Sequence, residues 1–322
     1  MNNKTYIIAE AGSNFDGDLD QAFKLIEIAA AAGADAVKFQ MFNADILYPD
    51  QASDVHKIVK KNELPRKWVN ALIKRCAVLG IDFLCSPFDT DALKILIEAG
   101  VKDLKWGSSE TTNLNLLREA AKTRKKIYLS TGTCTMSDIS DAIEVLDKNN
   151  SGEVILLHCY SVYPTNYEDC NLKVMETLRQ AFGLRVGLSD HSLGTAIPVA
   201  AVAMGAEVIE KHFTISREFD GPDHSYALEP DELKSMILQI RQVEAALGIG
   251  LKRLHQDEFK WNRRNGLYVS RDLKAGEILN VTDIFEKRPA TDLEPRFKGL
   301  IISRTTTRDV KAGDPVTWDL ID

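Results

Sequence analysis

Ile7-Ile8-Ala9-Glu10 is the first of eight short apolar runs that each end in a polar, chemically reactive residue. The other seven are Ala36-Val37-Lys38, Phe83-Leu84-Cys85-Ser86, Leu104-Lys105, Ile127-Tyr128-Leu129-Ser130, Ile155-Leu156-Leu157-His158, Val186-Gly187-Leu188-Ser189 and Val208-Ile209-Glu210-Lys211-His212. Such runs are typical of buried strands. Helix-like segments separate them, which favours a parallel sheet, and eight units favour closure into a (β/α)8 (TIM) barrel. The carboxyl ends of barrel strands form the rim where active sites are built, so the polar run ends predict an enzyme.

The segments between the strands carry helical periodicity. In residues 18–32, Ala22, Ile26 and Ala29 recur near the helical period, and Gly33 is a typical helix end. The other predicted helices cover 65–79, 92–99, 113–123, 136–147, 172–180, 195–205 and 230–247.

The sequence changes in character after Gly248. We predict a barrel domain over 1–248, a basic and polar linker over 249–262, and a small β-rich domain over 263–322. The last contains an internal repeat, because Arg271-Asp-Leu-Lys-Ala-Gly-Glu277 returns as Arg308-Asp-Val-Lys-Ala-Gly-Asp314. About 60 residues are few for independent stability. We therefore expect this domain to pack against a barrel, its own or that of a partner subunit.

The composition is that of a globular protein, with 44% apolar and 27% charged residues and a net charge of −7. The absence of a dense basic stripe argues against nucleic-acid binding. No run approaches about 18 apolar residues and no signal peptide precedes the first strand, so we expect a cytoplasmic protein that does not enter the membrane. The five cysteines form no Cys-x-x-Cys pair, which makes a disulfide framework or a structural zinc site an unfavoured interpretation.

Three lysines, Lys38, Lys105 and Lys211, lie at predicted strand ends. Hydroxyl groups and glycines accompany them, at Ser86, Ser108, Ser109, Ser130, Thr131, Ser189, Gly107 and Gly132. Lysine, hydroxyl and glycine N–H groups together hold phosphate or carboxylate through charge-assisted hydrogen bonds. A single rim lysine more often forms an ion pair, but three together favour a bound anion.

Two histidines, His191 and His212, lie at the ends of the last two predicted strands, each within two positions of an acidic residue, Asp190 or Glu210. Adjacent strands would bring both imidazoles to one divalent metal ion, with water or carboxylates completing the shell. A lone strand-end histidine is more often structural, and His158 is interpreted in that way. Glu10 either pairs a rim lysine or acts as a general acid–base or substrate-orienting carboxylate.

These residues belong to motifs that resemble the N-acetylneuraminate (sialic acid) synthase family. The motifs are Ile8-Ala-Glu10-Ala-Gly-Ser-Asn14, Ala-Val-Lys38-Phe-Gln40, Ser86-Pro-Phe, Lys105-Trp-Gly-Ser108-Ser-Glu110, Leu-Ser130-Thr-Gly, His158-Cys-x-x-x-Tyr163-Pro-Thr, Gly187-Leu-Ser189-Asp-His191, Glu210-Lys-His212-Phe-Thr and Gly221-Pro-Asp223. They span nearly the whole chain in order. The residues from about 263 onward resemble the family's C-terminal SAF (antifreeze-like) domain.

The resemblance implies a reaction. Members of the family condense phosphoenolpyruvate with an N-acetylated hexosamine, typically N-acetylmannosamine. The products are a nine-carbon 2-keto-3-deoxy acid and phosphate, formed by C–O cleavage through a tetrahedral intermediate.

The resemblance also assigns roles. The positions matching phosphoenolpyruvate-binding residues are Lys38, Ser86, Lys105, Ser108, Ser130 and Ser189. His191 and His212 match the ligands of a divalent cation, Mn²⁺, Mg²⁺ or Co²⁺, and the active-site carboxylates are Glu10 and Glu110. Positions facing metal, water or sugar are Gln40, Glu110, Tyr163 and Asp223. Arg288 resembles the SAF-domain arginine that enters the neighbouring subunit's barrel to contact the sugar, which implies a domain-swapped homodimer.

One position departs from the family pattern, because Ser161 stands where an asparagine commonly helps to bind phosphoenolpyruvate. Its shorter hydroxyl donates only one hydrogen bond, so a water molecule could fill the space. The acceptor sugar stays open between N-acetylmannosamine, a diacetamido sugar of legionaminate or pseudaminate synthesis, and a sugar for spore-coat polysaccharide. The rival interpretations are a Schiff-base aldolase and a non-catalytic carbohydrate- or ice-binding protein.

Overall fold

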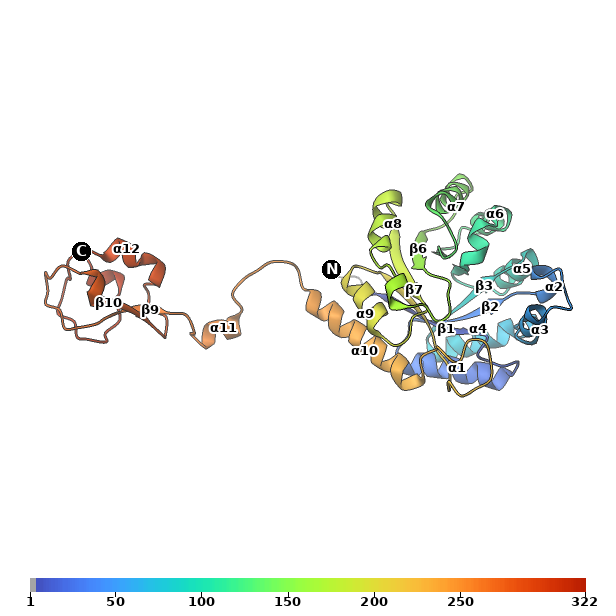
Figure 1. The fold of residues 1–322 in the computed structure, drawn as a ribbon, viewed down its shortest axis with the longest axis horizontal. Coiled ribbons are helices and arrows are strands. Elements are labelled where there is room, and N and C mark those ends of the chain that lie inside the picture. Colours follow the sequence, from blue (N-terminus) through green and yellow to red (C-terminus); the bar gives the residue numbers. More distant parts are fainter. Residues whose placement is uncertain (1–3) are drawn as a thin grey trace. The chain divides into compact units, whose positions relative to one another are not determined.

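The computed structural model describes residues 4–322, which form two compact units (Figure 1). One unit ends at Gly248 and the other begins at Ile249. The predicted linker, 249–262, falls in the second unit, where it forms a short helix, α11 (Gln256–Lys260). Over residues 4–322, no helix is both long and apolar enough to cross a bilayer.

Eight parallel strands form the barrel of the first unit, and all eight predicted strands are confirmed. They are β1 (Tyr6–Gly12), β2 (Ala36–Met41), β3 (Asp82–Pro87), β4 (Leu104–Trp106), β5 (Ile127–Ser130), β6 (Val154–Cys159), β7 (Arg185–Asp190) and β8 (Val208–His212). Hydrogen-bonded neighbours run in the order β3-β2-β1-β8-β7-β6-β5-β4. β3 and β4 lie side by side across the remaining seam, which confirms the (β/α)8 barrel.

Helices surround the strands (Figure 1). They are α1 (Leu19–Ala32), α4 (Val69–Leu79), α5 (Thr90–Glu98), α6 (Leu114–Lys122), α7 (Met136–Lys148), α8 (Val174–Phe182), α9 (Ala196–Ala203) and α10 (Pro230–Leu247). The Asp18 side chain accepts from the N–H of Asp20 at the start of α1, and Gly33 ends that helix at φ +88°. The 3-10 turns of this unit are η1 (Arg66–Trp68), η2 (Ser108–Thr112) and η3 (Tyr167–Asp169).

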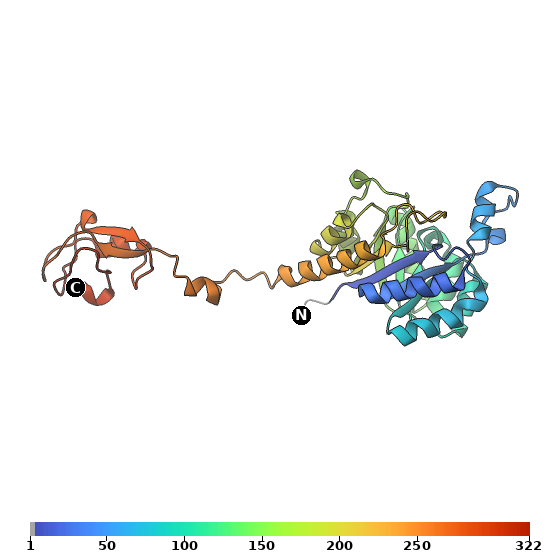
Figure 2. The ribbon, with the colours of Figure 1, turned by 90° about the horizontal axis from the view of Figure 1, so that it is seen from below.

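Two further helices, α2 (Ala44–Leu47) and α3 (Asp54–Lys61), occur between β2 and α4 and were not predicted. Figure 2 shows them standing apart from the ring of helices. The His56 Nε2 atom lies 2.8 Å from Asp45 Oδ1, so this histidine ties α3 to α2.

The barrel interior is built in two layers by the period-two alternation of its strands. The lower layer is apolar and consists of Ile8, Ala36, Leu84, Tyr128, Ile155, Leu157 and Val208. Two residues further along the same strands, the side chains become polar: Glu10, Lys38, Ser86, Ser130, Cys159 and Glu210. A larger apolar cluster fills the space between the strands and the helices. The alternation thus places a polar layer on an apolar floor at the carboxyl ends of the strands.

The second unit has its own apolar core and confirms the predicted β-rich domain. Its two strands, β9 (Gly266–Val269) and β10 (Ile284–Lys287), pair antiparallel, and its helical turns are η4 (Val281–Asp283), η5 (Pro295–Phe297), α12 (Lys298–Ile301) and η6 (Trp318–Leu320). The two repeats cap each other. The Asp309 carboxylate accepts from the N–H of Ala275 over 3.0 Å, and Asp272 accepts from the N–H of Ala312 over 2.8 Å.

Candidate active site

A cavity of about 220 Å³ lies over the polar layer, at the carboxyl ends of the barrel strands. Its lining residues are Glu10, Lys38, Gln40, Ser86, Phe88, Lys105, Gly107, Ser108, Ser109, Thr133, Cys159, Ser161, Tyr163, Ser189, His191, Glu210 and His212. Most of the residues predicted to bind substrate or metal therefore meet in one place, although they come from distant parts of the chain.

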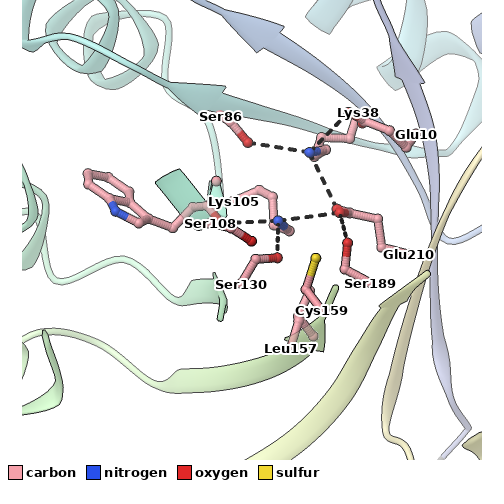
Figure 3. Close-up of polar contacts among 12 residues, drawn as sticks. Glu10, Lys38, Ser86, Lys105, Ser108, Ser130, Leu157, Cys159, Ser189 and Glu210 are labelled. Atoms are coloured by element: carbon pink, nitrogen blue, oxygen red, sulfur yellow. Dashed lines mark hydrogen bonds and ion pairs between the residues drawn. The ribbon is translucent and has the colours of Figure 1, made fainter. Parts of the chain in front are cut away.

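Two lysines point toward one carboxylate in this cavity (Figure 3). The Lys38 Nζ lies 3.5 Å from Glu210 Oε2, and the Lys105 Nζ lies 3.4 Å from Glu210 Oε1. The Ser189 hydroxyl donates to Glu210 Oε1 over 2.7 Å. Burial opposes ionisation of Glu210, but Lys105, Lys38 and Ser189 outweigh it and lower its pKa to about 2. Glu210 is thus an anion that holds both ammonium groups.

Each lysine also donates to a hydroxyl group. Lys38 Nζ donates to Ser86 Oγ over 3.4 Å, while Lys105 Nζ donates to Ser130 Oγ over 2.7 Å and to the Trp106 carbonyl over 3.1 Å. Both lysines are almost fully buried, at 4% and 1% exposure. Buried cationic and hydroxyl groups of this kind can hold a carboxylate or phosphate with little competition from water.

Glu10 shares Lys38 with Glu210 but has a different protonation behaviour. Its Oε1 lies 3.1 Å from Lys38 Nζ and accepts from Gln40 Nε2 over 2.6 Å, whereas its Oε2 is buried without a hydrogen-bond partner. Burial is the main cause that raises the pKa of Glu10 to about 7, with Lys38 opposing and Glu210 adding to the rise. A carboxyl group with a pKa near neutrality beside a substrate cavity can both take up and release a proton.

Close backbone approach at Gly132 shapes the next part of the cavity. The Gly132 N–H donates to Ser108 Oγ over 3.0 Å. A Cβ atom here would collide with Ser161 Oγ and lie 2.8 Å from Ser108 Oγ and 3.1 Å from Cys159 Sγ. Only glycine lets these three side chains converge, which places the hydroxyls of Ser108 and Ser161 next to each other in the cavity.

His191 and His212 lie together, with ring centroids 5.4 Å apart. His191 Nδ1 is 3.0 Å from the Tyr160 carbonyl, which can only accept, so Nδ1 carries a proton and Nε2 is the atom left to bind a metal ion. His212 Nδ1 is buried without a partner. Burial lowers the pKa of His212 to about 3 and keeps the imidazole neutral, the form that binds metal ions.

These two imidazoles fit a divalent cation as a pair of ligands. Within residues 4–322, no group of three or more His, Cys, Asp or Glu side chains is placed to hold a metal ion. Water or substrate oxygens would therefore complete the shell, as is usual for small divalent cations.

Aromatic rings and Asp223 surround the histidine pair. The Tyr163 ring lies 4.1 Å from that of His191, and the Tyr226 ring lies 5.3 Å from that of His212. Asp223 does not line the cavity. Its Oδ2 accepts from the N–H and the hydroxyl of Ser13 over 3.0 and 2.7 Å, and its Oδ1 accepts from the Tyr226 hydroxyl over 2.7 Å. Its carboxylate is thus anchored beside the site.

Lys211 is a correction to the predicted set of three anion-binding lysines. Because β8 alternates, Glu210 and His212 face the cavity and Lys211 faces the opposite side. Its ammonium group is bound to Asp190 and to the Ser192 carbonyl, both outside the cavity.

Glu110, like Asp223, does not line the cavity, and Arg288 belongs to the second unit. Glu110 lies in η2, where its carboxylate accepts from Asn113 Nδ2 over 3.0 Å. Arg288 follows β10 in the second unit and is exposed there. Of the two carboxylates predicted to be catalytic, Glu10 alone lines the cavity.

Sequence reasoning missed four residues that line the cavity: Phe88, Thr133, Cys159 and Glu210. Glu210 lies two positions before His212, and the period of a strand places the two side chains on the same face. That spacing was the signal for Glu210. Cys159 Sγ lies 3.8 Å from His191 Nδ1, a contact between the ends of β6 and β7 that no local pattern reveals.

Fold and cavity together define a class: a (β/α)8-barrel protein whose cavity at the strand ends places two buried lysines and several hydroxyl groups next to a pair of imidazoles. The family model described as the NeuB family matches residues 25–252, and the model of the SAF domain matches residues 264–322. The chain belongs to the NeuB family, which includes the sialic acid synthases, and carries the family's C-terminal SAF domain.

Individual relatives agree with this assignment. The chain is 42% identical to the N,N'-diacetyllegionaminic acid synthase of Campylobacter jejuni, covering 96% of this chain and 97% of the relative. It is 34% identical to a pseudaminic acid synthase of C. jejuni, covering 97% and 95%. The solved structure of an N-acetylneuraminic acid synthetase from Leptospira borgpetersenii, in complex with citrate, matches with a TM-score of 0.76 and 38% identity, covering 81% of this chain and 90% of that one.

Proposed function

We propose that the protein is a sugar-acid synthase that condenses phosphoenolpyruvate with an N-acetylated amino sugar and releases phosphate. The observation that supports it most is the pair of buried lysines held on Glu210 below the His191–His212 pair, in a chain of the NeuB family. Phosphoenolpyruvate carries a carboxylate and a phosphate, and the cavity supplies two cations with hydroxyl groups between them.

The roles of the residues follow from their positions. Lys38 and Lys105 hold the two anionic groups of phosphoenolpyruvate, with Ser86, Ser108 and Ser130 as hydroxyl partners, so that C3 faces the acceptor carbonyl. A divalent cation (Mn²⁺, Mg²⁺ or Co²⁺) held by His191 and His212 would supply Lewis-acid polarisation of that carbonyl. After the new C–C bond forms, water adds at C2, and Glu10 manages its proton. The tetrahedral adduct then expels phosphate by C–O cleavage.

The acceptor is the open part of the proposal. N-acetylmannosamine is the first candidate, since it is typical of the reaction that the motifs imply. A diacetamido sugar is the second candidate, and the 42% identity to a legionaminic acid synthase favours it. Phosphate release measured with phosphoenolpyruvate and each sugar in turn separates the two, and a Schiff-base aldolase would instead form a borohydride-trapped adduct with pyruvate.

The test of the reaction uses a matched pair of lysine variants. Lys105→Met removes a cavity cation and should abolish phosphate release. Lys102→Met alters an exposed lysine just before the same strand, paired with Asp82 over 3.2 Å, and should leave phosphate release unchanged. With ¹⁸O in the C2–O bond of phosphoenolpyruvate, the label should appear in phosphate. Label kept wholly in the keto acid would contradict C–O cleavage.

The proposal includes a cytoplasmic homodimer in which Arg288 of one subunit reaches the acceptor site of the other. Sedimentation of the full chain should show a dimer, and a strictly monomeric active enzyme would contradict this part. Arg288→Ala should raise the KM for the sugar and leave that for phosphoenolpyruvate unchanged, because the guanidinium is assigned to the acceptor alone.

A further inference from the structure

A buried ion pair lies directly behind the two histidines, on the helix-facing side of β7 and β8. Lys211 Nζ donates to Asp190 Oδ2 over 2.5 Å, and the two residues are 1% and 4% exposed. Backbone pairing of β7 with β8 reaches its last registered pair at Asp190 and Lys211. His191 directly follows Asp190, and His212 directly follows Lys211. Each member of the ion pair is therefore one peptide unit from a histidine.

Ser192 completes this arrangement. Its N–H donates to Asp190 Oδ1 and its hydroxyl to Asp190 Oδ2, both over 3.0 Å, and its carbonyl accepts from Lys211 Nζ. Both carboxylate oxygens and the ammonium group therefore have partners. Neither Lys211 nor Asp190 lines the cavity, so the pair has no group available to a substrate.

Such a pair needs an explanation, because two charges removed from water contribute little net stability compared with apolar side chains of similar volume. What it supplies is a fixed cross-strand link at the point where the strands separate. Neighbouring residues of a strand point to opposite faces. The link on the outer face therefore fixes the backbone from which His191 and His212 project into the cavity.

We propose that Lys211 and Asp190 are positioning residues that set the separation and orientation of His191 and His212, and through them the affinity for a divalent cation. The proposal rests on the metal site included in the proposed function. Lys211, which the sequence predicted to bind an anion, would instead support the two imidazoles. Residues that orient metal ligands without touching the metal typically change its affinity by roughly 10- to 100-fold when replaced.

The test measures Mn²⁺ binding to the full chain by titration calorimetry, without substrate. The double variant Lys211→Met/Asp190→Leu replaces the ion pair by apolar side chains of comparable volume, which keeps the packing but removes the polar link. The control is Arg185→Met/Glu207→Leu, which removes an ion pair of 2.8 Å at the other end of the same two strands. Thermal unfolding of each variant verifies that it is folded.

We expect one Mn²⁺ per chain in the unmodified protein, no binding in His212→Ala, and roughly 10- to 100-fold weaker binding in the Lys211/Asp190 double variant. The control variant should bind as the unmodified protein does. If the double variant does not fold, Asp190→Asn, which keeps the side-chain shape, should show the same direction of change.

Unchanged Mn²⁺ affinity in a folded double variant or in Asp190→Asn would overturn the inference while leaving the proposed function intact. Absence of Mn²⁺ binding to the unmodified chain would overturn the inference together with its metal site.

Discussion

At the scale of single residues, Glu10 and Glu210 show how environment separates two carboxylates of one cavity. Both are almost fully buried and both contact Lys38. Glu210 also contacts Lys105 and Ser189, and this extra stabilisation of the charged form lowers its pKa to about 2. Glu10 lacks those contacts, and burial raises its pKa to about 7. The pair therefore has one permanent anion and one group that titrates near neutrality.

Because the pKa of Glu10 lies near neutrality, we predict that the protein takes up protons when an anion binds in the cavity. Phosphoenolpyruvate placed at Lys38 brings negative charge close to Glu10, which favours the neutral carboxyl and raises its pKa further. At pH 7 the metal-free protein should therefore take up a fraction of a proton per phosphoenolpyruvate bound. Calorimetric titrations in two buffers of different ionisation enthalpy measure this. Glu10→Gln should take up fewer protons per phosphoenolpyruvate bound than the unmodified protein, and equal uptake by the two proteins would contradict the assignment.

His158 predicts a pH dependence of stability. It is buried on the outer face of β6 with Nε2 2.9 Å from the Cys170 carbonyl. Burial lowers its pKa below the ordinary value of 6.5. The unfolded chain therefore binds more protons below about pH 6.5, and the folded state loses stability as the pH falls. Between pH 7.5 and 5.5 this loss is at most about 1.4 kcal/mol for one histidine.

The measurement compares thermal or urea unfolding at those two pH values. His158→Gln removes the titrating group, so the difference in the free energy of unfolding between the two pH values should shrink. A variant with the same pH dependence as the unmodified protein would show that His158 does not contribute.

At the scale of elements, β7 contributes no side chain to the apolar floor of the barrel. Gly187 occupies the position, and a Cβ atom there would collide with the Val208 carbonyl oxygen and lie 2.8 Å from Leu157 Cδ2. Leu157 fills the space that Gly187 leaves. The glycine thus permits β6, β7 and β8 to pair beneath the cavity.

Gly187→Ala should therefore destabilise the barrel. Overpacking of a filled core typically costs about 1–3 kcal/mol, and chemical unfolding of the first unit measures it. Gly299→Ala is the control, since nothing lies within 4 Å of its added Cβ. It lies in α12, where alanine favours helix, so it should be neutral or slightly stabilising. Equal stability of the two variants would contradict the packing argument.

The strands and the main helices could be predicted because each has a local signal, an apolar run or a helical period with a stop. The helices α2 and α3 could not be predicted, since both are short and carry exposed apolar residues such as Ile46 and Ile58.

Most residues that line the cavity could be predicted because they lie at the ends of the strands. Lys211 was misassigned because Glu210-Lys211-His212 is polar throughout, so hydrophobicity does not reveal which side chains face inward. The ion pairs of Glu210 depend on β2 and β4, which no local pattern connects to β8.

At the scale of the whole molecule, the chain consists of two units with separate apolar cores. The segment between the barrel and β9 is exposed, including Leu251, Phe259 and Trp261. Exposed connecting segments are preferred sites of proteolysis. Limited digestion should therefore cut first within about 249–265, and mass spectrometry should identify a barrel fragment and an SAF fragment. Early cuts inside the barrel would contradict two independently folded units.

The two-layer interior of the barrel also constrains how this chain can evolve. Each side chain of the polar layer (Glu10, Lys38, Ser86, Ser130, Cys159 and Glu210) lies two residues beyond an apolar one. Inserting or deleting a single residue within a strand would therefore exchange the cavity face with the helix-facing one. New chemistry in the cavity must therefore arise by point substitution along the strands. Changes in chain length are confined to the loops at the rim, such as the α2–α3 insertion. The loops at the rim can diversify while the polar layer beneath stays in register.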